Sequence, residues 1–210
     1  TLHGVPLGSP AHGNALRQTE RCVSEVFETV GELRSEGEEI VLLIGSDHGQ
    51  ETIGECIDVA AWLAGHGLGN LIDAGDVAVA GQGTAALLYA TDQGRAALLG
   101  VLDEMRLAPW VEDVAGGEQL AELGHASPGR VVAAAHTHGL RRKRYVEPEP
   151  GKPAAIGSGQ HGGWGPDETR PFLIVDDAGR TSGTEPHATC LTDIAPTIAL
   201  HSSMPCRSVA

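Results

Sequence analysis

The stretch Ile40-Val41-Leu42-Leu43-Ile44-Gly45-Ser46-Asp47-His48-Gly49 joins an unbroken apolar run to a short polar turn. The apolar run predicts a strand over 39–44, and its continuity is typical of a parallel strand that is covered on both faces. Ligand-binding residues of open α/β sheets gather at the carboxyl ends of such strands, where this sequence has Asp47 and His48. Carboxylate and neutral imidazole hold zinc-like ions in catalytic sites. The stretch therefore predicts an α/β fold with a divalent metal site.

A second segment, Gly159-Gln160-His161-Gly162-Gly163, places another imidazole in a glycine-rich loop. Small flanking residues let a loop backbone bend until distant side chains converge on one ion, so the two segments together favour metal-assisted hydrolysis. Each segment alone has a simpler interpretation. Asp47-His48 could be a capped turn with a hydrogen-bonded histidine, and His161 could be a solvent-exposed loop residue.

The rest of the chain alternates helical and strand patterns. Ser9-Pro10 predicts the start of an amphipathic helix that ends near Gly37. The further predicted elements are a helix over 57–68, strands over 76–80 and 85–90, a helix over 95–106, strands over 131–138 and 171–175, and a helix that begins at 192–197. The part from about 70 to 155 is predicted as a small α+β insertion.

Charge and hydropathy limit the partners of the chain. It has 14 Lys and Arg against 28 Asp and Glu, a formal net charge of -14, which repels nucleic acid. A small phosphorylated substrate stays compatible, because bound divalent ions dominate the local potential. No stretch predicts a membrane span, and no signal segment is visible, so a soluble and preferentially cytoplasmic protein is expected. The sequence leaves the compartment and the oligomeric state open.

Three motifs together resemble a known family. Ser46-Asp47-His48-Gly49, Gly159-Gln160-His161-Gly162-Gly163 and Asp193-Ile194-Ala195-Pro196-Thr197 follow one another as in the type I phosphodiesterase/nucleotide pyrophosphatase family of the alkaline phosphatase superfamily. His3-Gly4 and Pro6-Leu7-Gly8-Ser9-Pro10 resemble the end of the family's Asp-x-x-x-His segment and its following turn. The likeness covers nearly the whole chain. It departs at His201-Ser202-Ser203-Met204, where the family usually has a Leu-Gly turn.

The resemblance implies a fold and a ligand set. The fold is an alkaline-phosphatase-like three-layer sandwich with a mainly parallel central sheet, here a single partial domain over 1–210 whose amino-terminal part is missing. Two divalent metal ions, usually zinc, are implied: His3 and His161 match ligands of one ion, and Asp47 and His48 match ligands of the other. A further Asp ligand for each ion, and the Thr or Ser nucleophile, would precede Thr1.

The implied activity is cleavage of phosphodiester or nucleotide pyrophosphate bonds through a covalent phospho-enzyme. With half of the ligands absent, this chain alone is predicted to bind metal weakly and to turn over poorly. Related alternatives are a phosphonoacetate hydrolase, a phosphomonoesterase, or a sulfatase-like or mutase-like relative. The alternative from another class is a non-catalytic, truncated metal-binding or interaction module.

Other polar residues are predicted to be structural. His136 and His138 share a strand face but lack a nearby carboxylate, and His187 precedes the last helix. The run Arg141-Arg142-Lys143-Arg144 is typical of a solvated loop. Thr84 follows a Gly-Gln-Gly turn, but its position after the Asp-His pair is wrong for a nucleophile of this family.

Overall fold

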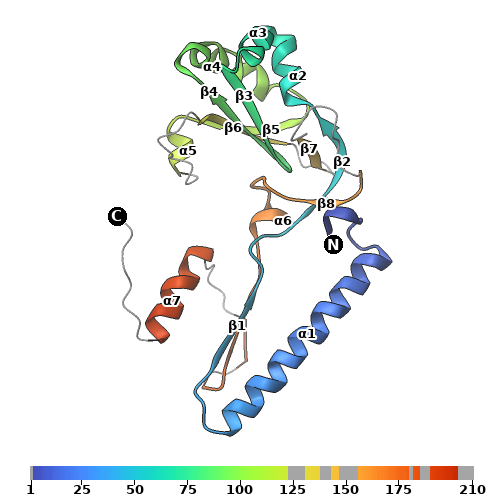
Figure 1. Ribbon diagram of the computed structural model, residues 1–210, viewed down its shortest axis with the longest axis vertical. Coiled ribbons are helices and arrows are strands. Elements are labelled where there is room, and N and C mark those ends of the chain that lie inside the picture. Colours follow the sequence, from blue (N-terminus) through green and yellow to red (C-terminus); the bar gives the residue numbers. More distant parts are fainter. Residues whose placement is uncertain are drawn as a thin grey trace. The chain divides into compact units, whose positions relative to one another are not determined.

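The computed structural model describes residues 2–122, 131–137, 143–146, 156–179, 182–184 and 190–202. Figure 1 labels its helices and strands, and the chain divides into two compact units. Unit 1 comprises Thr1–Thr29 and His48–Pro171, and unit 2 comprises Val30–Asp47 and Phe172–Ala210. Within the described ranges, no helix combines the length and the apolar character that crossing a bilayer requires.

The long helix α1 (Pro10–Ser35) begins where the sequence predicts. The Ser9 hydroxyl accepts a hydrogen bond from the His12 N–H at 3.2 Å, and Pro10 occupies the first helical position, where no N–H is needed. The helix ends before Gly37, whose φ of 99° suits a residue without a side chain. The short 3-10 turn η1 (Leu2–Gly4) precedes it and carries His3.

A four-stranded antiparallel sheet forms the centre of unit 1. Its order is β3 (Val77–Gln82), β4 (Ala85–Ala90), β6 (Val131–Thr137) and β5 (Val111–Gly116). The first two strands form the hairpin that the sequence predicts, and α4 (Asp92–Arg106) confirms the predicted helix. The sequence interpretation did not include β5 or the short helix α5 (Glu118–Glu122).

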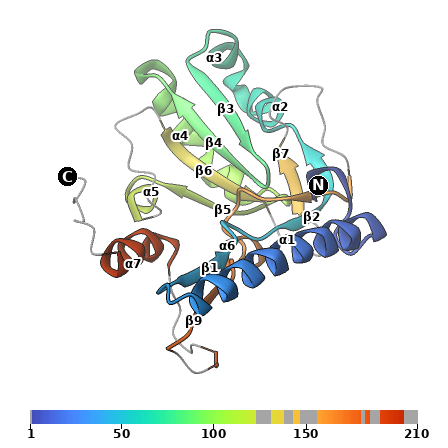
Figure 2. The same ribbon diagram turned by 60° about the horizontal axis from the view of Figure 1, so that its bottom comes forward.

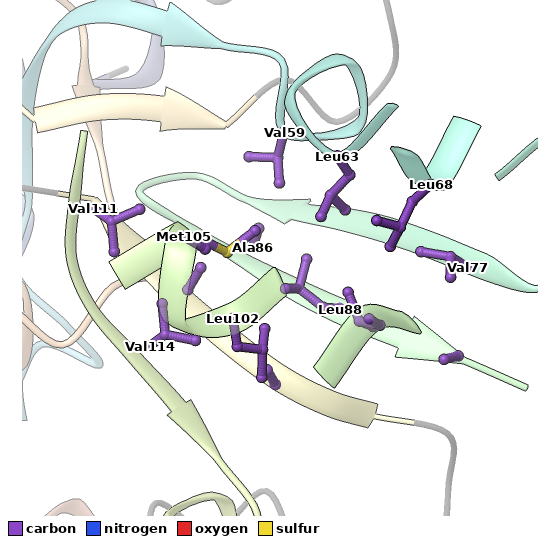
Figure 3. Packing of buried hydrophobic residues seen from close by; sticks show 14 of the residues in the cluster. Val59, Leu63, Leu68, Val77, Ala86, Leu88, Leu102, Met105, Val111 and Val114 are labelled. Atoms are coloured by element: carbon purple, nitrogen blue, oxygen red, sulfur yellow. The ribbon is translucent and has the colours of Figure 1, made fainter. Parts of the chain in front are cut away.

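The core of unit 1 lies between this sheet and the helices α2 (Val59–Leu63) and α4 (Figure 3). Leu63, Leu88, Leu98 and Met105 are fully buried there. Full burial of each such side chain contributes about 1.5–3 kcal/mol. The π-turn η2 (Ala64–Leu68) and the helix α3 (Gly69–Asp73) continue from α2, and Leu68 joins the same cluster.

A smaller three-stranded sheet, of order β7-β2-β8, also belongs to unit 1. The strand β2 (Glu51–Ile57) pairs in parallel with β7 (Lys143–Val146) and antiparallel with β8 (Gly159–Gln160). The sequence interpretation missed β2 and began a helix at 57, which is the last residue of that strand. It also placed Lys143 and Arg144 in a solvated loop, and this was wrong because their backbone lies in β7. The helix α6 (Pro166–Thr169) follows β8.

Unit 2 contains a two-stranded ribbon of β1 (Val41–Gly45) and β9 (Leu173–Asp177), seen in Figure 2. The strands are antiparallel, with Val41 opposite Asp177 and Gly45 opposite Leu173. The Arg34 guanidinium donates to the Ile40 carbonyl and to Asp176, which ties the end of α1 to both strands. The 3-10 turn η3 (Leu191–Asp193) and the helix α7 (Ile194–His201) confirm the predicted final helix.

The expected three-layer sandwich with a mainly parallel central sheet is wrong. In the described part of the chain the strands form three small sheets, and β2–β7 is the single parallel pair. β1, predicted as a parallel strand covered on both faces, is half-buried and runs antiparallel to β9. An apolar run specifies a strand that buries side chains, but it contains no information on the direction of its partner.

Some sequence predictions cannot be compared with the structure. His138, Arg141, Arg142 and His187 lie outside the described residues, and of His136 only the backbone in β6 is described. The predicted insertion at about 70–155 contains the four-stranded sheet and α4, while α2 and η2, which share their core, precede it. A single partial domain with an insertion stays a prediction.

Candidate functional site

Three imidazole rings from distant parts of the sequence lie together in unit 1. The rings of His48 and His161 are stacked, with centroids 3.6 Å apart and planes inclined by 21°. The ring of His3 lies 5.1 Å from that of His161, and these two planes are inclined by 53°. The fold thus assembles His3, His48 and His161, three of the four residues predicted as metal ligands.

Short strand pairings produce this grouping. His48 lies just before β2 and His161 just after β8, and the pairs Glu51–Gln160 and Thr52–Gly159 align the two strands. The turn η1 contacts β8, and a bridge between Pro6 and Ser158 holds the segment that follows His3. Each histidine is therefore placed by backbone pairing close to its own position in the chain.

Two of the rings have a defined tautomer. His3 Nδ1 lies 3.1 Å from Gln160 Oε1, and His48 Nδ1 lies 2.8 Å from the Gly49 carbonyl oxygen. Both oxygens can only accept, so each Nδ1 carries a hydrogen and donates it. In the neutral ring, Nε2 then holds the lone pair, which is the arrangement of histidines that bind metals through Nε2.

Asp47, the fourth residue predicted as a metal ligand, directly precedes His48 in the chain. It is exposed and is the last residue of the first segment of unit 2, and its peptide bond links it to His48. Among the residues that the structure describes, no three His, Cys, Asp or Glu side chains are grouped as ligands of a single ion.

The ring separations can be compared with zinc geometry. Two imidazoles on one tetrahedral zinc, with bonds of about 2.0–2.1 Å and an angle of about 109°, have centroids about 5.2 Å apart. His3 and His161, at 5.1 Å, fit that requirement. For a separation like that of His48 and His161, at 3.6 Å, the same bond lengths would force an angle of about 70°, far from tetrahedral. The spacing of His3 and His161 is therefore compatible with one shared tetrahedral ion, and the spacing of His48 and His161 is not.

Three polar residues around the imidazoles were not assigned a role from the sequence. Gln160 accepts from His3, as described above. Thr84, in the turn between β3 and β4, and Glu168, in α6, are both buried, and the Thr84 hydroxyl donates to Glu168 Oε1. Gln160 could have been suspected because it is adjacent to His161. Nothing in the sequence distinguishes buried Glu168 from its exposed neighbour Asp167.

A scan against protein-family models gives no match, and searches of curated proteins and of solved structures also find none.

Proposed function

We propose that this chain supplies ligands to a two-metal phosphohydrolase site that cleaves phosphodiester or nucleotide pyrophosphate bonds. The observation that carries the proposal is the difference between the two ring separations, 5.1 Å for His3 and His161 and 3.6 Å for His48 and His161. That difference fits the assignment of the three histidines to two neighbouring ions, which the family resemblance implies independently.

Each residue has a separate role in this proposal. His3 and His161 hold one ion, and His48 holds the other together with Asp47. Gln160 and the Gly49 carbonyl fix the tautomers of His3 and His48, so that both rings present Nε2. The resemblance implies a Thr or Ser nucleophile, and none of the residues named here is proposed for that role. When bound to these residues, two divalent ions would supply Lewis acidity toward the phosphoryl oxygens of the substrate.

The substrate class follows from the resemblance and is compatible with the charge of the chain. A net charge of -14 disfavours a polyanionic partner, whereas a small phosphate ester needs only the local field of the ions. Phosphodiesters and nucleotide pyrophosphates come first; phosphomonoesters and phosphonoacetate are the alternatives for the same ligand frame.

The test uses the protein as its gene encodes it, with zinc measured by mass spectrometry and hydrolysis measured on bis(p-nitrophenyl) phosphate, p-nitrophenyl phosphate and phosphonoacetate. We expect two bound zinc ions and a preference for the diester. The variant His161→Ala should bind one zinc ion fewer. Loss of a residue that only hydrogen-bonds to a metal ligand lowers activity by roughly 10–100-fold, so we expect His161→Ala to lower it by at least that much. The control is His201→Ala, because His201 is an exposed residue of α7.

Two results would contradict the proposal. Wild-type protein that binds no zinc would exclude the metal site. Zinc binding without turnover of these three substrates or of a nucleotide pyrophosphate would identify a non-catalytic metal-binding module.

A further inference from the structure

The turn of the β3–β4 hairpin touches the loop that carries His161. The Thr84 N–H donates to the His161 carbonyl at 3.3 Å, and the Gly163 N–H donates to the Thr84 hydroxyl at 2.8 Å. Thr84 thus holds the backbone on both sides of Gly162. These bonds connect the hairpin of the four-stranded sheet to the backbone that carries His161.

The two turns approach each other too closely for side chains at two positions. A Cβ atom on Gly83 would overlap the His161 carbonyl oxygen, and a Cβ atom on Gly162 would overlap the Gln82 carbonyl oxygen. Both glycines also have positive φ angles, 68° and 124°. The contact is therefore made by interlocked backbones, so a shift of the hairpin turn moves the His161 loop directly.

Glu168 extends this contact to the residue that follows His48. Its side chain accepts from the Thr84 hydroxyl, and its carbonyl accepts from the Gly49 N–H at 2.7 Å. Through Glu168, the segment after His48 and the loop of His161 share one anchor. Because the two rings stack at 3.6 Å, a small displacement of either segment changes how the imidazoles face each other.

The hydrogen bond between Thr84 and Glu168 is buried, and the burial of these polar groups costs desolvation free energy. Thr84 is fully buried and the exposed fraction of Glu168 is 2%. Removal of a carboxylate from water is expensive, and apolar residues at such positions often give an equally or more stable fold. Placement of the site accounts for the link better than stability does.

We propose that Thr84 and Glu168 are positioning residues, which set the place of His161 relative to His48 and so determine metal affinity. This inference rests on the proposed function. It assigns to the hairpin turn a part in metal binding, although the hairpin itself provides no ligand.

The experiment measures binding of cobalt(II) alone, by its visible absorption, to metal-free protein as its gene encodes it. Thr84→Val keeps the shape of the side chain and removes the hydroxyl, so we expect cobalt affinity to fall by roughly 10–100-fold. Thr84→Ser restores the hydroxyl and should restore most of the affinity and the wild-type spectrum.

The matched control is Thr91→Val. Its hydroxyl donates to Asp76 Oδ1 at 2.6 Å at the open end of the same hairpin, so the substitution breaks a similar Thr–carboxylate bond away from His161. Thr91→Val should lower the melting temperature without changing cobalt affinity. A role of Thr84 in stability alone predicts the same result for both valine variants.

The outcomes separate the two proposals. Wild-type protein that binds no cobalt contradicts the proposed function and this inference with it. Wild-type binding that is unchanged in Thr84→Val contradicts only the inference. Should Thr84→Val fail to fold, Glu168→Gln provides the measurement, because it keeps the volume and weakens the bond that Thr84 donates. We expect at least threefold weaker cobalt binding, and unchanged binding would overturn the inference.

Discussion

The two units differ in how they use apolar residues. In unit 1 the sheet and helices bury Leu63, Leu98 and Met105 completely. In the described part of unit 2, Val30 is the single buried residue, and the exposed fractions of Phe172 and Ile174 are 56% and 51%. Apolar sequence is present in both. A core forms where several segments meet, whereas a two-stranded ribbon gives each residue neighbours on few sides.

The largest test of this comparison is truncation of a core residue. Leu98→Ala should lower the free energy of unfolding of unit 1 by about 2–5 kcal/mol, because the cavity in the core cannot collapse completely. Leu99→Ala is the control on the same helix, since Leu99 is 46% exposed, and it should cost less than about 1 kcal/mol. Trp62, Trp110 and Trp164 all belong to unit 1, so urea unfolding followed by tryptophan fluorescence measures this unit.

Ile174→Ala applies the same truncation to the ribbon. Because Ile174 is already half exposed, the opening free energy of the β1 and β9 amides, measured by hydrogen exchange, should fall by less than about 1 kcal/mol. A cost equal to that of Leu98→Ala would show that this strand is buried in solution, and the contrast between the units would fail.

A smaller loss of stability is expected from removal of the Arg34 hydrogen bonds in unit 2. Arg34 donates to the Ile40 carbonyl from two nitrogens, at 3.1 and 2.8 Å, and to the side chain and carbonyl of Asp176, both at 2.8 Å. Arg34→Met keeps the apolar stem and removes all four bonds, so we expect a loss of about 1–3 kcal/mol in hydrogen-exchange protection of β9. Arg17→Met, whose guanidinium donates to Asn14 at an exposed site, is the control and should change little. Equal effects would mean that Arg34 contributes no more than a surface residue.

A smaller effect is expected at Cys190, an exposed thiol of unit 2. Hydrogen bonds from the side chain and backbone of Thr192 stabilise the thiolate and lower the pKa of Cys190, although Asp193 opposes them. A lowered pKa increases the thiolate fraction at neutral pH and therefore the rate of alkylation. Thr192→Val should raise the pKa and slow alkylation by iodoacetamide by roughly two- to fivefold at neutral pH.

Thr197→Val is the matched control for this measurement, because its hydroxyl donates to the Asp193 carbonyl and not to the thiol. If the alkylation rate of Cys190 changed in Thr197→Val but not in Thr192→Val, hydrogen bonds from Thr192 would not be the cause of the lowered pKa.

The smallest change in stability is expected at the ion pair of Arg106 and Asp103 in unit 1, which can be compared with the pair of Arg34 and Asp176 in unit 2. Arg106 and Asp103 on α4 lie 2.6 Å apart, closer than the 2.8 Å of Arg34 and Asp176. The Asp103 side chain is nevertheless 94% exposed, so water screens the pair and Asp103→Ala should cost less than about 0.5 kcal/mol in urea unfolding. A cost similar to that of Arg34→Met would show that distance, and not exposure, decides the contribution of these pairs.

Much of the local structure was predictable from the sequence. The serine cap and proline that begin α1, the apolar run of β1, the hairpin of β3 and β4 and the periodicity of α4 are each specified by neighbouring residues. The motifs also led to His3, His48 and His161, which lie together, although their role as metal ligands stays a prediction. β2 was missed because Gly54 and two glutamates interrupt its apolar pattern.

The sequence by itself determined where α1, the β3–β4 hairpin, α4 and the final helix form and which histidines are candidates for a site, because caps, turns and periodicity act over a few residues. Tertiary structure alone decided that β1 pairs antiparallel with β9, that Glu168 is buried beside Thr84, and that Gln160 accepts from His3. Those outcomes depend on which distant segments meet and at what distance. Packing and backbone pairing set that distance, and the pattern of a single segment does not contain it.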